Sequence, residues 1–161
     1  MLKKIFFAVL LLTAFAACKS KSAFDYSQDF AKKEKSLLPD ITATADNVKR
    51  YMEKEQYDSI AYAGDKMEKL VEVKVKEIKD KPAPDAREGD NFKEAGIRYF
   101  NFIKSMYSGY KKFGEAKTPE ARAEEMKNLI AVTNKKNAAI EDMQRAQKSY
   151  ADANGFKLEN K

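Results

Sequence analysis

Residues 92–113 read FKEAGIRYFNFIKSMYSGYKKF, and their spacing indicates the fold class. Side chains suited to a buried face recur at alternating steps of four and three residues, and they are Phe92, Gly96, Tyr99, Ile103, Met106, Tyr110 and Phe113. This heptad spacing places them along one side of an α-helix that packs against other helices. The pattern predicts a helix that begins at an Asp90 N-cap and ends at Gly114.

Two further amphipathic helices are expected before this segment. The first begins at Asp25, and its buried face consists of Phe30, Leu37, Ile41, Val48 and Met52. The second spans about residues 56–79, and its buried face consists of Ile60, Met67, Val71 and Ile78. Because proline has no amide hydrogen and clashes with the preceding turn, Pro39 predicts a kink or a restart of the first helix near Leu38.

A fourth helix is expected after the aromatic segment. Thr118 suits its N-cap, Pro119 its first position, and Glu120 the positive end of its dipole. Its inner side carries Leu129, Val132, Ala139, Met143, Ala146 and Tyr150. Asn154 and Gly155 suit its C-terminus, after which Phe156 and Leu158 can fold back onto the helices. Four such helices joined by short turns predict an all-α, antiparallel up-down four-helix bundle over residues 25–158.

The composition limits the chemistry that this bundle can perform. The 161 residues suffice for one domain, and Leu, Ile, Val and Phe are scarce after residue 17, so Tyr, Ala and Met must complete the core. The absence of histidine and the single cysteine remove most acid–base chemistry at neutral pH and any multi-cysteine metal site. The net charge of +6 comes mostly from lysines interspersed with acids, which favours a soluble surface over nucleic-acid binding.

Residues 1–17 have the layout of a secretory signal peptide. Lys3 and Lys4 precede an apolar run, which ends in small residues before Cys18. A transmembrane helix would need ~20 apolar residues, and this run is shorter. Two cleavage sites remain open: one after Ala16, which would leave a free thiol, and one directly before Cys18.

Residues 15–18, FAAC, resemble the lipobox of bacterial lipoproteins, although Phe15 stands where leucine is usual. In that family the cysteine becomes the first residue and carries lipid. Because a lone exposed thiol is a liability in an oxidising compartment, lipidation of Cys18 is favoured over a free thiol. The resemblance implies a thioether-linked diacylglycerol and an amide-linked acyl chain such as palmitate. More than one buried chain gives stable anchoring to a membrane.

Residues 18–24 are then expected to form the lipidated cysteine and a short polar tether. Lys19 stands where an aspartate would retain an enterobacterial lipoprotein in the inner membrane. The sequence therefore indicates a lipid-anchored protein of the bacterial cell envelope, at the outer membrane and facing the periplasm.

Three groups of side chains are candidates for a metal site, a partner surface or a ligand pocket. Glu124, Glu125, Glu141 and Asp142 lack the histidines of bundle metal sites, so they are expected on solvated faces beside Lys127, Lys135 and Arg145. Phe100, Phe102 and Tyr107 lie off the main stripe, and they either widen the buried face or leave an exposed apolar patch for a partner. Asn137, Gln144 and Gln147 either hydrogen-bond within the core or line a small polar pocket.

Residues 144–158, QRAQKSYADANGFKL, resemble small surface lipoproteins of uncharacterised function from Bacteroidetes and leptospires. In these proteins an alanine–glutamine pair is followed by an aromatic–alanine pair and a short hydrophobic end. An early tyrosine such as Tyr26 and a mid-chain aromatic helix are also similar. The resemblance implies a helical lipoprotein with no assigned activity, and it carries no functional residue over.

The sequence therefore predicts a non-enzymatic envelope lipoprotein without metal or cofactor. Its helical bundle would bind a protein partner or a cell-wall component while the lipid on Cys18 holds it at the membrane. The alternative is a periplasmic chaperone or small-ligand carrier that grips apolar groups with the off-stripe aromatic side chains. An enzyme would need lysine, tyrosine or carboxylate chemistry in a pocket.

Overall fold

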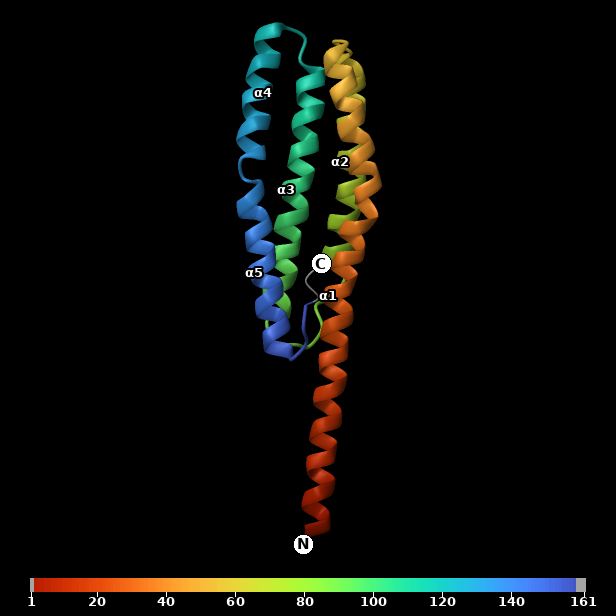
Figure 1. Ribbon diagram of the computed structural model, residues 1–161, viewed down its shortest axis with the longest axis vertical. Helices are drawn as coiled ribbons and strands as arrows, with labels where there is room; N and C mark the ends of the chain where they lie inside the picture. The colour runs from red at the N-terminus through yellow and green to blue at the C-terminus, as the bar shows by residue number, and fades with distance from the viewer. Residues whose placement is uncertain (1, 159–161) are drawn as a thin grey trace.

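The computed structural model describes the backbone of residues 2–158 and the side chains of residues 20–158. Within that range the chain forms five helices and no strand: α1 (Leu2–Glu53), α2 (Tyr57–Asp80), α3 (Gly89–Glu115), α4 (Pro119–Thr133) and α5 (Lys136–Asn154). Successive arms run in opposite directions, and α4 and α5 follow one another in a single column beside α3 (Figure 1). The predicted all-α, antiparallel up-down bundle is confirmed, with α4 and α5 together as its fourth arm.

The fourth arm is not the single helix that the periodicity predicts. It breaks at Asn134 and Lys135, between α4 and α5. Val132, Thr133 and Asn134 have low helix propensity, because β-branched side chains lose rotamer freedom in a helix and asparagine competes for backbone hydrogen bonds. Only Leu129 of α4 is fully buried, so little packing opposes the break.

The first helix also differs from expectation. Pro39 lies inside α1, which continues through it without interruption, so the predicted restart near Leu38 is wrong. The proline faces solvent, whereas Leu37 is buried and Ile41 packs against the core, and these contacts hold the helix on both sides of the missing hydrogen bond. Packing also starts before the expected boundary at Asp25, because Ala23 is fully buried.

Helix ends follow the predicted signals in two places out of four. The Thr118 hydroxyl accepts a hydrogen bond from the Ala121 amide at 3.1 Å, and Gly155 ends α5 in the left-handed conformation, as predicted. By contrast, Glu88 precedes α3 without a side-chain cap, and Asp90 lies in the first turn. Gly114 is the next-to-last residue of α3, so the helix ends one residue later than predicted, with Ala116 as its C-cap; the glycine is buried at a close helix contact.

The central helix α3 approaches its neighbours through glycines. A methyl group at Gly114 would overlap the backbone of α2 at Tyr57 and Ala61. From the other side, a methyl group at Gly64 of α2 would lie 2.5 Å from the Lys111 backbone nitrogen. Gly96 faces the ring of Phe30 on α1, and Gly109 faces Leu129 on α4. The glycines of α3 thus mark close contacts with three different helices.

Aromatic side chains fill the core near the end of the bundle where α5 finishes. The rings of Phe92 and Tyr150 stack at 4.8 Å with an interplanar angle of 8°, and Phe30 lies 4.7 Å from Phe92. Phe156 folds back to within 5.8 Å of the Tyr150 ring, as predicted from the sequence. Buried tyrosine, alanine and methionine therefore complete a core that has few aliphatic residues. The hydroxyls of Tyr26 and Tyr150 are buried with no hydrogen-bond partner among the described residues.

A matched pair of glycine substitutions tests the approach of α2 to α3. We expect Gly64→Ala to lower the free energy of unfolding by about 1–3 kcal/mol, because its methyl group meets backbone that has no room to move. Gly109→Ala meets the flexible end of Leu129, so the gain in helix propensity of about 1 kcal/mol should offset its cost. Urea denaturation of both variants measures the difference, and equal stabilities would contradict the close contact.

The unpaired hydroxyl of Tyr150 provides a second test. We expect Tyr150→Phe to be as stable as the parent or more stable, because it removes a buried polar group that has no partner. In Tyr99→Phe a hydrogen bond to Glu34 is lost, so this control should cost about 1 kcal/mol. A clear loss of thermal stability in Tyr150→Phe would show that its hydroxyl is paired in solution.

Candidate functional site

A cavity opens between α1, α3 and α5, and we call it the α1–α3–α5 cavity. Its volume is about 190 Å³. The lining residues are Phe30, Ala31 and Glu34 from α1, Tyr99 and Phe100 from α3, and Ile140, Met143, Gln144 and Gln147 from α5. Three helices that are distant in sequence therefore supply one site, and its lining combines aromatic and aliphatic groups with polar groups.

The polar part of the wall is organised around Glu34. The Tyr99 hydroxyl donates a hydrogen bond of 2.6 Å to Glu34 Oε1. Burial raises the pKa of Tyr99 above its ordinary value, and the hydrogen bond to the Glu34 carboxylate raises it further. Tyr99 therefore stays protonated at neutral pH and acts as a donor. The Glu34 carboxylate has no lysine or arginine partner among the described residues.

The apolar part of the wall depends on a glycine. The ring of Phe30 lies directly over Gly96, where any larger residue would overlap it. Phe30 and Phe100 are almost fully buried, and they line the cavity together with the partly buried Met143. The close contact of α1 with α3 thus fixes the place of the Phe30 ring in the lining.

Two of the three predicted polar residues meet here. Gln144 and Gln147 line the cavity, whereas Asn137 is exposed and lies outside it. The Gln147 amide donates a hydrogen bond of 3.2 Å to the hydroxyl of Ser27 on α1, and this bond links the two helices. Both interpretations that the sequence left open therefore hold in part: Gln144 and Gln147 line a pocket, although its lining is partly apolar, and Gln147 also hydrogen-bonds to the buried Ser27.

Sequence reasoning missed Glu34 and the role of Tyr99. The missed signal is positional, because Glu34 lies four residues after Phe30 and three before Leu37, on the buried stripe of α1. A charged residue in such a position must either pair or lie at an opening to solvent. Tyr99 was expected on the buried face of α3, and its polar tip turns out to reach Glu34.

The off-stripe aromatic side chains widen the core. Phe100 and Tyr107 are buried and Phe102 is partly buried against the same cluster. Of the two interpretations that the sequence left open, the widened buried face is correct, and an exposed aromatic patch on α3 is not formed by these residues.

Of the four acidic candidates on the fourth arm, Glu124, Glu125 and Asp142 lie beside basic or amide groups, and Glu141 is exposed. Glu124 pairs with Lys127 at 3.4 Å, as predicted. Asp142 pairs with Arg145 at 3.6 Å and also with Arg98 of α3 at 2.7 Å, a contact that the sequence did not predict. Among the described side chains of residues 20–158, no group of three or more potential ligands is arranged to hold a metal ion.

The predicted lipidation site cannot be compared with the structure. The side chain of Cys18, like those of the predicted signal peptide over residues 1–17, lies outside the described side chains. Within the described part of the chain, no helix combines the length and apolar character needed to cross a membrane.

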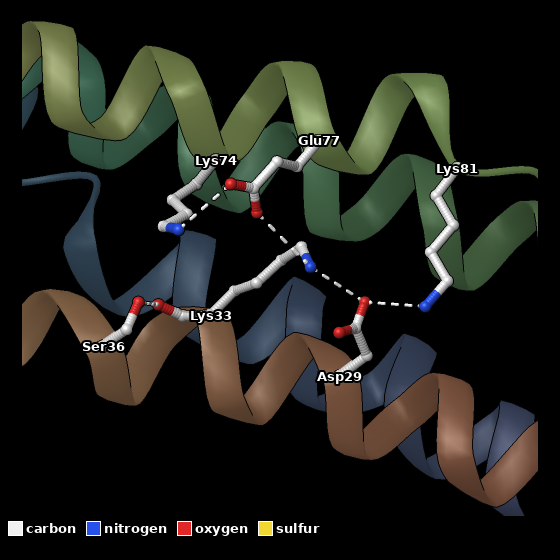
Figure 2. A network of polar contacts seen from close by, with 6 residues as sticks. All are labelled: Asp29, Lys33, Ser36, Lys74, Glu77 and Lys81. Atoms are coloured by element: carbon white, nitrogen blue, oxygen red, sulfur yellow. Dashed lines mark hydrogen bonds and ion pairs between the residues drawn. The ribbon is translucent and has the colours of Figure 1, made fainter.

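A chain of ion pairs joins α1 to α2, as Figure 2 shows. Asp29 Oδ2 accepts hydrogen bonds from Lys33 Nζ at 2.9 Å and from Lys81 Nζ at 3.0 Å. Glu77 pairs with Lys33 at 3.5 Å and with Lys74 at 3.2 Å. Each carboxylate therefore has two lysine partners. Burial raises the pKa of Asp29, but the two lysine hydrogen bonds outweigh it and hold the pKa below its ordinary value.

Comparison with known proteins identifies no relative of this chain. No protein-family model matches it, and neither a search of curated proteins nor a search of solved structures finds a similar protein. The function is therefore argued from the residues and geometry of the chain.

The lowered pKa of Asp29 predicts a sensitivity to acid. Above its unfolded value of about 3.9 the ionised carboxylate stabilises the fold, and this stability is lost as the pH falls through the lower folded value. We expect Asp29→Asn to be less stable than the parent at neutral pH and to lose less stability on acidification. The control is Asp58→Asn, whose side chain is 94% exposed, and it should follow the parent in urea denaturation. An Asp29→Asn variant with the acid sensitivity of the parent would contradict this role.

Proposed function

We propose that this chain is a non-enzymatic lipoprotein of the bacterial cell envelope, anchored at the outer membrane through Cys18. Its helical bundle binds a protein partner or a cell-wall component. The observation that carries the proposal is the short stretch of chain between the predicted attachment site and the packed core. Ala23 is fully buried, only five positions after Cys18.

This short connection restricts where the bundle sits. Even when fully extended, five residues span at most ~18 Å. Lipid on Cys18 would therefore hold one end of the bundle next to the membrane. That end contains the start of the packed part of α1, the loop between α2 and α3, and the end of α5 (Figure 1). The turns between α1 and α2 and between α3 and α4 lie at the opposite end, where a partner has the freest access.

Membrane fractionation tests the anchor. In a Gram-negative host we expect the parent protein to enter the outer-membrane fraction and to incorporate labelled palmitate, because its cysteine carries acyl chains. We expect Cys18→Ala to take up no label and to leave that fraction, whereas the nearby control Ser20→Ala should behave as the parent.

Two results would contradict the anchor. One is a parent protein that incorporates no labelled fatty acid. The other is a Cys18→Ala variant that stays in the membrane fraction as fully as the parent, because its attachment would then not depend on the cysteine.

A second candidate function, a small-ligand carrier, is favoured by the α1–α3–α5 cavity. It is open to solvent, lined by apolar rings and polar tips, and supplied by three helices. The chaperone form of this alternative has less support, because Phe100 and Tyr107 are buried and offer no apolar grip to an unfolded client. Binding of a neutral aromatic probe, 2-phenylethanol, tests the carrier function through the NMR signal of the Met143 methyl group. No shift at millimolar probe would count against a carrier.

A further inference from the structure

We propose that the α1–α3–α5 cavity binds a small primary amine that carries an aromatic ring or a short hydrocarbon chain. The ammonium group pairs with the Glu34 carboxylate, and the apolar part lies against Phe30, Phe100 and Met143. This inference rests on the small-ligand carrier function and adds the chemical class of the ligand.

The volume of the cavity sets the size of the ligand. An engineered apolar cavity of about 150 Å³ accepts benzene. At about 190 Å³, the α1–α3–α5 cavity has room for one six-membered ring and one or two further atoms, so the ammonium end of a two-carbon chain would lie at the opening, where Glu34 is exposed. Larger ligands would extend through the opening into solvent.

The apolar wall suits a ring or an alkyl chain. Phe30 and Phe100 present buried aromatic surface, and Ile140 and Met143 line the α5 side. Aromatic rings pair favourably in offset or edge-on geometry, and the polarizable methionine sulfur packs well against ring edges. This part of the wall supplies affinity but little discrimination between ligands of the same shape.

Glu34 supplies the discrimination by charge. Among the residues that line the cavity, only Glu34 and Tyr99 have ionisable side chains, and Tyr99 is protonated. The Tyr99 hydroxyl donates a hydrogen bond to Glu34 Oε1, and the structure shows no partner for Glu34 Oε2 among the described residues. Other carboxylates at helix contacts have lysine partners already: Asp29 with Lys33 and Lys81, Asp65 with Lys69 and Lys111, and Glu72 with Lys104. Glu34 thus lacks the cation that its counterparts have, and a ligand ammonium can supply it.

The amide of Gln144 completes the polar part of the site. It lines the cavity and is exposed, so its carbonyl oxygen can accept a second ammonium hydrogen. The Gln147 amide already donates a hydrogen bond to Ser27, so Gln147 lines the cavity without taking part in ammonium binding. A carboxylate ligand of the same shape would face Glu34 with like charge and is excluded.

Three probes of matched size test the proposal on the mature protein: phenethylamine, 2-phenylethanol and phenylacetate. We expect calorimetry and the Met143 methyl signal to show phenethylamine binding about tenfold more tightly than 2-phenylethanol, with no binding of phenylacetate. Glu34→Gln should remove the preference for the amine and leave 2-phenylethanol binding unchanged. Glu72→Gln makes the same change of charge outside the cavity and should keep the preference.

Two further variants separate the ligand site from the stability of the fold. Tyr99→Phe removes the hydrogen bond to Glu34 Oε1, so both carboxylate oxygens become free for the ligand. This variant should bind phenethylamine at least as tightly as the parent. Ala31→Leu fills the cavity from its exposed rim and should weaken all three probes. Thermal denaturation confirms that each variant is folded.

The outcomes distinguish the inference from the carrier function. Binding of 2-phenylethanol without any preference for phenethylamine would overturn the amine assignment and leave the carrier function standing. An amine preference that survives in Glu34→Gln would likewise overturn it. Failure of all three probes to bind the parent would overturn both. None of these results depends on the lipid anchor, which the fractionation experiment tests separately.

Discussion

The close approach of other helices to α3 is the constraint on which the rest of the bundle depends. Glycines at positions 96, 109 and 114 face α1, α4 and α2 in turn, and Gly64 of α2 faces α3 from the other side. Short interhelical distances increase the number of dispersion contacts that each buried side chain makes. In a chain with few aliphatic residues, this close packing and the large aromatic rings together fill the interior.

The same contacts leave the α1–α3–α5 cavity where Glu34, an exposed residue of α1, borders the buried stripe of that helix. An ionised carboxylate loses much free energy when it is removed from water, which favours an opening to solvent at Glu34 over closure into core. The Tyr99 hydroxyl satisfies one carboxylate oxygen, and Phe30 is held in place over Gly96. A helix contact that exists for packing thereby shapes a site with a defined size and charge.

Periodicity predicted most buried positions correctly. All four residues expected on the inner side of α2 are buried, because α2 packs extensively against α3. Errors lie where local signals and packing compete: α1 passes through Pro39, and the fourth arm breaks after Thr133. Of the candidate site, Gln144 and Gln147 were identified from the sequence as polar residues near the inner face of the last arm. Their meeting with Glu34 could not be predicted, because it depends on how α1 and α5 are rotated about their axes.

The sequence by itself determined the number of arms, most of their buried positions and their antiparallel order, because side-chain period and turn length are local properties. The prediction of lipidation at Cys18 likewise rests on the order of residues alone. Only the tertiary structure decided which helices touch α3 through glycine, and that Glu34, Tyr99 and Gln144 share one cavity. Those outcomes depend on interhelical distance and rotation, which arise from the packing of the complete set of side chains.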